Sequence, residues 1–252
     1  MPVDLLIAGA KELHIMLQPE QLQAFRIYAE ELLAWNARFN LTAITDDAGV
    51  QVRHFLDSLS CLAVLESDGP LTGKTLIDVG TGAGFPGIPL KILRPSLRLT
   101  LLEATEKKTQ FLSHIVKRLN LKWVTVLHGR AEELGQDSAY RERYDWVAAR
   151  AVAEMPILAE YLLPLARIGG RVLAQKGESA PAEVQAADHA ITTLGGRVQR
   201  LAPVELRGLA ETRYLVLLEK IAATPVQYPR RPGVPTKRPL QAIALLSGEL
   251  GL

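Results

Sequence analysis

The sequence contains few of the residues and patterns that mark secreted, membrane-spanning or metal-binding proteins. Cys61 is the only cysteine, so the chain can form neither an internal disulfide nor a cysteine-rich zinc site. No apolar run approaches the roughly 20 residues that a membrane-spanning helix needs. The N-terminus has no basic residues ahead of its short apolar stretch, so we expect no signal peptide. These absences predict a cytoplasmic protein that contacts no membrane and holds no metal ion.

Charge is nearly balanced, with a formal net charge of +2, but one segment is strongly biased. The residues from Lys220 to Pro239 include five basic residues, five prolines and no acidic residue. Proline removes backbone donors and interrupts helices, so we expect this segment to follow an extended, partly ordered path. Its charges predict either a solvated tail or a contact with a polyanion.

The first 70 residues have the spacing of amphipathic helices. A second helical region is expected over residues 45–66, and either Thr45 or Asp46 is suited to cap it. Ahead of it, large apolar residues recur at intervals of three and four and so share one helical face, namely Phe25, Tyr28, Leu32, Trp35 and Phe39. We expect this aromatic face to pack in the core.

From residue 75 onward, strand signals alternate with helix signals. Such alternation predicts a doubly wound parallel sheet that helices cover on both faces. The expected strands are 75–80, 97–103, 123–128, 144–150 and 170–175. The expected helices lie near 86–94, 106–120, 131–137, 154–167 and 181–194.

The last two strand signals, residues 196–206 and 212–220, are joined too briefly to include a helix. Strands joined in this way must pair antiparallel. A seven-stranded, mostly parallel sheet that ends in an antiparallel hairpin is typical of the Rossmann-like class I methyltransferases that use S-adenosylmethionine (SAM). We therefore predict an α/β domain of this class over residues 71–221. A helical extension, residues 1–70, precedes it, and a basic proline-rich segment, residues 222–252, follows it.

A glycine-rich loop follows the first strand and allows two interpretations. Gly82 to Gly87 form a literal G-x-G-x-x-G, which is the fingerprint of a dinucleotide site. The run Gly80-Thr81-Gly82-Ala83-Gly84 resembles instead a SAM loop, where missing Cβ atoms let the backbone approach the ligand. A pyrophosphate needs free N–H groups at the start of the following helix. Pro86 and Pro89 remove two of these donors, and SAM has no phosphate, so SAM is favoured.

Acidic residues at the ends of the first strands are candidates for contacts with the cofactor. Asp78 is suited to bind the amino group of the methionine part. Glu103 lies 23 residues after Gly80, where a carboxylate can accept both ribose hydroxyls, although NAD also has a ribose. After the third strand, the Ala131 backbone and Glu132 can contact an adenine edge. Glu132 can equally stabilise a helix N-terminus as a carboxylate of its first turn.

Several longer motifs connect these residues to one family. They are "WNARFNLTAI", "RHFLDSL", "DVGTGAGFPGIPL", "GRAEE", "ARAVA", "QKG" and "YPRRPGVPTKRPL". Together they cover almost the whole chain, which resembles the bacterial small-subunit ribosomal RNA methyltransferase G family, also called glucose-inhibited division protein B. The resemblance implies methyl transfer from SAM, which becomes S-adenosylhomocysteine, to N7 of a guanine in a loop of 16S ribosomal RNA.

The resemblance also implies which residues contact the cofactor. Glu103 is included although the family often has aspartate there, because the longer side chain should still reach a ribose. The matching positions are Gly80, Phe85, Glu103, Ala104, Thr105, Ala131, Glu132 and Arg150. Asp78, Gly82 and Gly84 complete the expected cofactor contacts.

No acid–base constellation accompanies these motifs, and the implied reaction explains why. Methylating C5 of a pyrimidine needs a cysteine nucleophile, and we expect Cys61 to be a core residue. Methylating an exocyclic amine usually involves an Asn/Asp-Pro-Pro-aromatic motif, where this chain has "ARAVAEMP". Guanine N7 carries a lone pair and no proton, so catalysis is expected to depend on orientation. We assign no certain catalytic residue.

Arg150, at the end of the fourth strand, is the candidate for positioning. Its planar fork can bind guanine O6, a phosphate or the cofactor, and a salt bridge to Asp78 or Glu154 is the structural alternative. His54 shares a helical turn with Arg53 and Asp57, and we interpret it as a packing residue.

Recognition of a looped guanine should use phosphate contacts and a splayed-out base. The four basic residues of the C-terminal segment, as exposed charges, should contribute little to stability. The candidates are Arg53, Lys176, Arg230, Arg231, Lys237 and Arg238. The expected partner is 16S ribosomal RNA or a precursor small subunit. An NAD-dependent oxidoreductase, a non-catalytic SAM-binding protein associated with RNA and, more weakly, a small-molecule methyltransferase remain alternatives.

Overall fold

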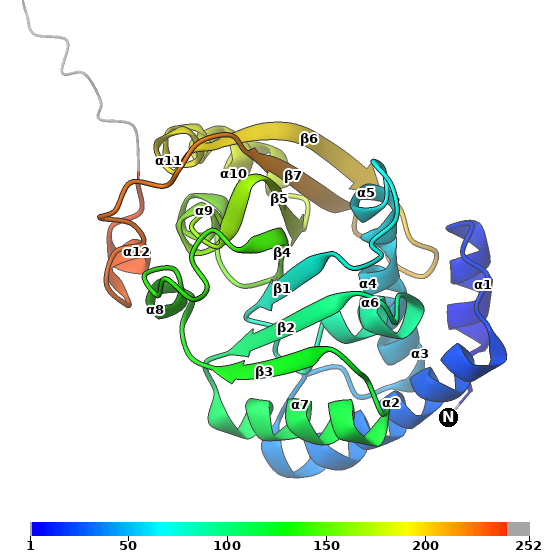
Figure 1. Ribbon diagram of the computed structural model, residues 1–252. Helices are drawn as coiled ribbons and strands as arrows, with labels where there is room; N and C mark the ends of the chain where they lie inside the picture. The colour runs from blue at the N-terminus through cyan, green and yellow to red at the C-terminus, as the bar shows by residue number, and fades with distance from the viewer. Residues whose placement is uncertain (1, 241–252) are drawn as a thin grey trace, which may run out of the picture.

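Seven strands form a single mixed sheet in the computed structural model, which describes residues 2–240. Their spatial order is β3-β2-β1-β4-β5-β7-β6, as Figure 1 shows. All pairs from β3 to β5 are parallel, and β7 runs antiparallel to both of its neighbours. The strands are β1 (Thr75–Val79), β2 (Arg98–Glu103), β3 (Val124–His128), β4 (Tyr144–Arg150), β5 (Ala166–Lys176), β6 (Gly196–Val204) and β7 (Arg213–Lys220). The predicted class I methyltransferase fold is confirmed.

The direction of winding reverses between β1 and β4. From β1 the chain adds β2 and β3 on one side, and it then returns to add β4 and β5 on the other. Open α/β sheets bind their ligands at such a switch point, beyond the carboxyl ends of the strands. A ligand site is therefore expected at the loops after β1 and β4.

Strand alternation divides the core into two layers. Successive side chains point to opposite faces of a strand, so Leu76 and Ile77 of β1 belong to different apolar clusters. The cluster of Leu76 includes Phe25, Tyr28 and Leu32. The expected aromatic face of the N-terminal helix is therefore confirmed as core, and it shares that core with the sheet.

Helices from the N-terminal half cover the first face, and those from the second half cover the other (Figure 1). The first group is α1 (Asp4–Glu12), α2 (Pro19–Phe39), α3 (Asp47–Gly49), η1 (Val50–Leu56), α4 (Asp57–Ser60), α5 (Leu62–Leu65), α6 (Gly87–Leu93) and α7 (Glu106–Arg118). The second is α8 (Ala131–Leu134), α9 (Met155–Leu162), α10 (Ala180–Ala186) and α11 (Asp188–Thr193). None of the described helices is long and apolar enough to cross a membrane.

The helix expected over residues 45–66 is divided into four pieces. Asp46 does cap it, because its carboxylate accepts the Gly49 N–H at 2.7 Å. The second piece, η1, is a π-helix, in which the Asp57 N–H donates to the carbonyl of Val52, five residues earlier. Short π-helical segments occur frequently at functional sites. Side-chain periodicity does not reveal this change in winding.

Two further helices differ from expectation. The helix expected over 154–167 ends at Leu162, because Pro164 has no backbone N–H with which to continue it, and β5 begins at Ala166. The helix expected over 181–194 is two helices, α10 and α11.

The basic C-terminal segment is packed against the domain, contrary to the expected extended path. Its residues 234–237 form a short helix, α12 (Val234–Lys237), beside α8 and α9 (Figure 1). The Arg141 guanidinium donates to carbonyls of this segment, those of Thr224 and Tyr228, at 2.7 Å each. Residues 241–252 of the predicted segment lie outside the described residues.

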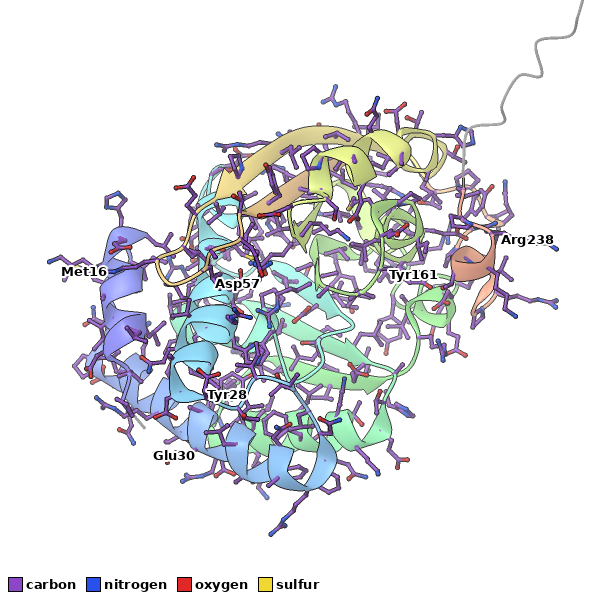
Figure 2. The ribbon with its side chains drawn as sticks, turned by 180° about the vertical axis from the view of Figure 1, so that it is seen from behind. Met16, Tyr28, Glu30, Asp57, Tyr161 and Arg238 are labelled. Carbon is purple, nitrogen blue, oxygen red and sulfur yellow. The ribbon has the colours of Figure 1, made fainter. Side chains whose placement is uncertain are left out.

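Arg230 corrects the expectation that the charges of this segment contribute little to stability. Its guanidinium binds both carboxylate oxygens of Glu160, with contacts of 2.6 to 3.2 Å, and its backbone N–H adds one at 2.8 Å. The Glu160 side chain is completely buried, and that of Arg230 is 23% exposed. A buried carboxylate needs such a partner, because burying an unpaired charge is costly. Arg231, Lys237 and Arg238 are exposed, and Figure 2 shows Arg238 at the outer edge of the molecule.

We predict that Arg230→Ala lowers the free energy of unfolding by about 3 kcal/mol, because it leaves the Glu160 carboxylate buried and unpaired. Arg231→Ala, the neighbouring control, should change it by less than about 0.5 kcal/mol. Urea denaturation measures both values. If Arg230→Ala is as stable as the control, the ion pair is not structural. Adding Glu160→Leu should restore part of the loss.

Candidate functional site

The glycine loop after β1 is folded around the Asp78 carboxylate. Its Oδ2 accepts the Thr81 hydroxyl at 2.6 Å and the Gly87 N–H at 2.8 Å. The side chain is completely buried, and its Oδ1 has no hydrogen-bond partner among the described residues. Burial raises the pKa of Asp78 to about 6, although Thr81 and Gly87 oppose the shift. The Asp78 carboxylate therefore holds the loop through Oδ2, while Oδ1 remains able to accept a hydrogen bond.

Gly80 lies where the loops after β1 and β4 meet. Its φ is 66°, in the left-handed region that favours glycine. A Cβ atom added there would lie 2.8 Å from Cγ2 of Val152, in the loop after β4. Glycine is therefore required at position 80, as the sequence pattern predicts. At Gly82, by contrast, an added Cβ meets nothing within 4 Å, so the face of the loop at this position is open.

Aromatic rings from the N-terminal helices support the far side of the loop. The Tyr28 hydroxyl donates to the Ala83 carbonyl at 2.5 Å. The Phe85 ring stacks on Tyr28 at 5.3 Å and on His54 at 4.3 Å between centroids. Because Phe85 is 4% exposed, it acts as a spacer between the loop and the N-terminal layer. Gly84 leaves room for the Tyr28 hydroxyl, because a Cβ atom at position 84 would lie 2.6 Å from it.

Glu103, at the end of β2, faces the same loop. Its two carboxylate oxygens accept the Gly82 N–H at 3.0 Å and the Thr105 N–H at 2.8 Å. Each carboxylate oxygen can accept more than one hydrogen bond, so both can still receive a ribose hydroxyl. Ala104, between them, accepts a hydrogen bond from His128 through its carbonyl at 3.0 Å.

Ala131 and Glu132 begin α8, at the end of β3. Both are buried. The Glu132 carboxylate accepts the Gly233 N–H of the C-terminal segment at 3.2 Å, while Glu133 accepts the N–H of Arg130 at the helix start. Glu133 therefore closes the helix N-terminus, and Glu132 instead joins α8 to the segment that follows β7. The adenine contact of Ala131 and Glu132 stays a prediction.

The hydrogen-bond acceptors around the loop fit SAM. The unpartnered Oδ1 of Asp78 is suited to the cationic amino group, and the Glu103 oxygens are suited to the two ribose hydroxyls. The open face at Gly82 leaves space for the ligand between them. All three features belong to the ends of β1 and β2, which are adjacent in the sheet.

Arg150, at the end of β4, is bound to the N-terminal helices. Its Nη1 donates to Asp57 Oδ2 at 2.8 Å and to the Arg53 carbonyl at 2.9 Å. Its guanidinium also lies over the Phe85 ring, 5.0 Å from the centroid. Arg150 therefore does form a salt bridge, as the structural alternative predicted. Its partner, however, is Asp57 and not Asp78 or Glu154.

His54 is a packing residue, as predicted, and its protonation state follows from its neighbours. Arg150 can only donate, so Nδ1 of His54, 3.2 Å away, accepts. Nε2 then carries the proton and donates to the Thr42 hydroxyl at 2.9 Å. Burial, reinforced by the Arg150 charge, lowers the pKa of His54 to about 3.

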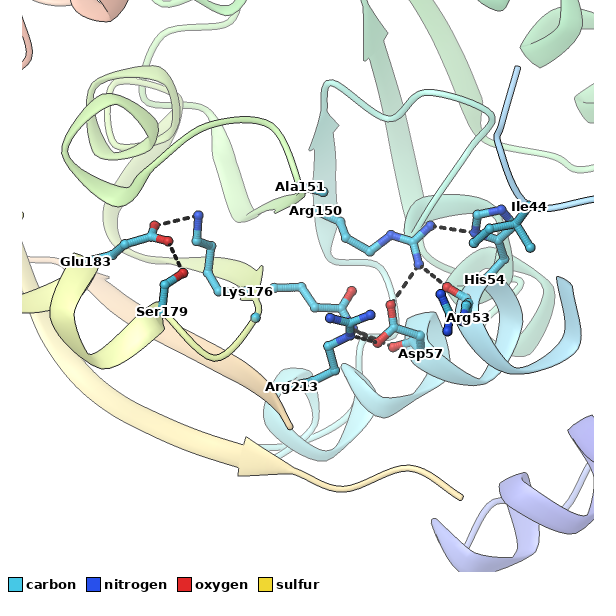
Figure 3. A pocket seen from close by; sticks show the side chains of 12 residues that line it. Ile44, Arg53, His54, Asp57, Arg150, Ala151, Lys176, Ser179, Glu183 and Arg213 are labelled. Atoms are coloured by element: carbon cyan, nitrogen blue, oxygen red, sulfur yellow. Dashed lines mark hydrogen bonds and ion pairs between the residues drawn. The ribbon is translucent and has the colours of Figure 1, made fainter. Parts of the chain in front are cut away.

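A cavity of about 320 Å³ opens beside Arg150, at the ends of β4 and β5 (Figure 3). This volume is at the lower end of the range for ligand sites, roughly 300 to 1,000 Å³, and suits one nucleotide. The Lys176 ammonium pairs with Glu183 at 2.6 Å on one wall. The lining residues are Ile44, Arg53, His54, Asp57, Arg150, Ala151, Gln175, Lys176, Gly177, Ser179, Glu183 and Arg213.

The predicted RNA contacts form two separate groups. Arg53 and Lys176 line the cavity. The other four belong to the C-terminal segment beside α8 and α9, and one of these, Arg230, is bound to Glu160. None of the six roles is tested by this arrangement, and they stay predictions.

Among the cavity residues that had no predicted role, Asp57 and Arg213 bear most directly on its charge. From the sequence, Asp57 is noted only as a neighbour of His54, yet its buried carboxylate lies between Arg150 and Arg213. Arg213 is missed entirely, because a basic residue at the start of a strand has no distinctive spacing. The sequence offered one signal for Asp57, which is its position one helical turn after Arg53.

Comparisons with known proteins agree along almost the entire chain. A family model described as rRNA small subunit methyltransferase G matches residues 21–209. The ribosomal RNA small subunit methyltransferase G of Roseiflexus sp. (strain RS-1) is 52% identical over 238 residues, 94% of this chain and 100% of that protein. The corresponding protein of Lactobacillus delbrueckii subsp. bulgaricus (strain ATCC BAA-365 / Lb-18) is 44% identical over 240 residues, 95% and 100% of the two chains.

Solved structures share the fold at much lower identity. A SAM-dependent methyltransferase from Aquifex aeolicus has a TM-score of 0.51 and 18% identity, covering 71% of this chain and 96% of that one. TrmN from Thermus thermophilus has a TM-score of 0.51 and 19% identity, covering 66% and 48%. At these identities the likeness concerns the fold alone.

We predict that Glu103→Gln weakens SAM binding by about 10- to 150-fold, because a charge-assisted pair of hydrogen bonds to the ribose contributes about 1.5–3 kcal/mol. The amide is nearly isosteric with the carboxylate, so the fold should persist. Titration calorimetry measures the affinity, and circular dichroism provides the folding control. Unchanged affinity in the folded variant would reject the ribose assignment.

We predict that Asp78→Asn raises the stability of the protein relative to the wild type as the pH rises, while it lowers the affinity for SAM. The folded pKa of Asp78, about 6, lies above its ordinary value of 3.8, so ionising this buried carboxylate costs stability as pH rises from 4 to 6. Between pH 4 and pH 7 the variant should therefore gain about 3 kcal/mol relative to the wild type, at about 1.4 kcal/mol per pKa unit. SAM affinity should fall. A stability difference independent of pH would contradict the assignment.

Proposed function

The chain belongs to the rRNA small subunit methyltransferase G family, and we propose from this premise that it methylates N7 of a guanine in 16S ribosomal RNA. SAM is the methyl donor of this family. The close relatives are all named as ribosomal RNA methyltransferases, which sets aside the oxidoreductase, the non-catalytic binder and the small-molecule methyltransferase. The observation that supports N7 as the target is the absence of an available proton acceptor among the described residues that line the cavity.

Each acid and histidine of that lining is already engaged. His54 has hydrogen bonds at both ring nitrogens. The Asp57 carboxylate binds Arg150 and the Gln175 amide, and Glu183 binds Lys176, the Ser179 hydroxyl and a backbone N–H. General-base catalysis would require one of these groups to exchange a present partner for the substrate proton.

Methylation at N7 has no such requirement. Guanine N7 carries an in-plane lone pair and no proton. When bound, SAM supplies a methyl group on a positively charged sulfur, which such a lone pair can attack. The task left to the protein is to hold the base, align N7 with the methyl carbon and exclude water, which is catalysis by orientation.

The chain has residues suited to each part of this task. Glu103 and Asp78 would hold the cofactor at the ends of β1 and β2. Arg150 lies between this loop and the cavity. Its hydrogen bonds to the Arg53 carbonyl and the Asp57 carboxylate fix its position. We assign Arg150 the role of orienting the substrate guanine. Cys61 is not a nucleophile in this scheme, because it is completely buried and burial raises the pKa of its thiol.

The proposed substrate is a guanine in a looped region of the RNA, either in free 16S ribosomal RNA or in a precursor small subunit. A base in a loop can be splayed out into a pocket at little cost. The cavity has the volume for one nucleotide, and Arg53 and Lys176 in its lining offer phosphate contacts.

We predict a flat pH profile for the chemical step. Under single-turnover conditions with saturating SAM and RNA, the rate constant should be constant from about pH 6 to about pH 9, because no enzymic acid–base pair takes part. His54, with a pKa of about 3, stays neutral throughout. A bell-shaped profile would contradict the mechanism. So would a cavity variant that loses chemistry, keeps both binding steps and is rescued by small exogenous bases.

A further inference from the structure

The cavity beside Arg150 contains more positive charge than its own carboxylates compensate. Four cationic residues and two anionic residues line it. Glu183 pairs with Lys176 at 2.6 Å, and Asp57 Oδ2 pairs with Arg150 at 2.8 Å. Arg53 has no ion pair inside the cavity, and Arg213 shares Asp57 with Arg150, at 3.7 Å from Oδ1.

Arg53 is the more accessible of the two. Its side chain is exposed on η1, and it makes no ion pair or side-chain hydrogen bond with any residue in the described range 2–240. Only its backbone carbonyl is engaged, by Arg150. A guanidinium in this position is free to bind an anion that enters the cavity mouth.

Arg213, at the start of β7, is held at a fixed place without being neutralised there. Its Nε lies 3.7 Å from Asp57 Oδ1, beyond hydrogen-bond distance. Its Nη1 lies 3.4 Å from the exposed carboxylate of Glu211, outside the cavity lining. The side chain is 23% exposed. Asp57 therefore orients the guanidinium, and its remaining N–H groups are available to a ligand.

The two arginines lie at one opening. In Figure 3 Asp57 lies between them, with Arg53 coming from the helix on one side and Arg213 from the strand on the other. They are 160 positions apart in the sequence, since 213 − 53 = 160, yet both line the same cavity. Guanidinium groups bind phosphate oxygens with two parallel hydrogen bonds.

We propose that Arg213, together with Arg53, binds the phosphate backbone next to the target guanine, with the base inserted into the cavity. This inference rests on the proposed function for the identity of the base and adds a residue for binding the nucleotide. Asp57 is the positioning residue, because one buried carboxylate aligns Arg150 toward the base and Arg213 toward the phosphate. Insertion of an unstacked base places its flanking phosphates at the rim of its pocket, where these arginines lie.

The test measures binding of small ribosomal subunits that lack the modification, as a function of salt concentration. Each phosphate contact with a single strand contributes about 0.7 to the slope of log K against log salt. Arg213→Gln should therefore reduce the slope by about 0.7, and adding Arg53→Gln should reduce it by about 0.7 again. RNA affinity at low salt should fall about tenfold for each change, while SAM affinity stays at the wild-type value.

Arg197→Gln is the matched control. Arg197 lies at the opposite end of the same β6–β7 hairpin and also forms an exposed ion pair, with Glu219. It should leave both the slope and the affinity unchanged. The proposal is overturned if Arg213→Gln keeps the wild-type slope, or if the control loses as much.

A second variant covers the case in which Arg213→Gln does not fold because Asp57 loses a neighbour. Arg213→Lys keeps the charge beside Asp57 but loses the fork, so the slope should persist while affinity drops severalfold. Wild-type affinity in Arg213→Lys would overturn the proposed fork. Since these measurements report binding, their result is independent of whether the wild-type protein transfers a methyl group. A failure of the proposed function would appear instead as absent methyl transfer by the wild type.

Discussion

The contact between Arg150 and Asp57 joins the two parts of the protein on which the site depends. Arg150 ends a central strand at the switch point, and Asp57 belongs to the helices of the N-terminal layer, 93 residues away in sequence. Their ion pair is nearly buried, with side chains 14% and 4% exposed. Breaking a buried pair leaves one charge without compensation, so the arrangement is held in place. The His54 and Phe85 rings stack beside this ion pair, so the glycine loop after β1 is supported by the N-terminal helices.

This arrangement shows how the basic residues of the protein divide by environment. Arg150 and Arg230 are held by buried carboxylates, Asp57 and Glu160, and their charges are largely compensated. Arg53 faces the cavity with no ion pair among the described residues, and Arg213 only shares the Asp57 carboxylate with Arg150, at 3.7 Å. Formal charge in the sequence does not distinguish these groups. The distance to a buried carboxylate does, because only an uncompensated cation offers its full field to an incoming polyanion.

Much of the fold could be predicted from local patterns, and the differences have physical causes. Strand order follows from the alternation of strands and helices, and the antiparallel end follows from a connection too short for a helix. The position of Glu103 follows from its spacing after Gly80, since both lie at strand ends on one edge. The Arg150–Asp57 and Arg230–Glu160 pairs join segments 93 and 70 residues apart, and a single sequence does not specify such pairings. The π-helical winding of η1 was likewise invisible, because it changes backbone hydrogen bonds and not residue type.

We propose that the glycine loop holds SAM and that the cavity beside Arg150 holds the guanine that is methylated at N7 in 16S ribosomal RNA. The most direct measurement is transfer of a tritiated methyl group from SAM to small subunits that lack the modification, followed by mass spectrometric mapping of the labelled nucleotide. We expect one labelled guanine, with the methyl group on the imidazole ring at N7. Label on an exocyclic amine, on a pyrimidine carbon or on a ribose would contradict it.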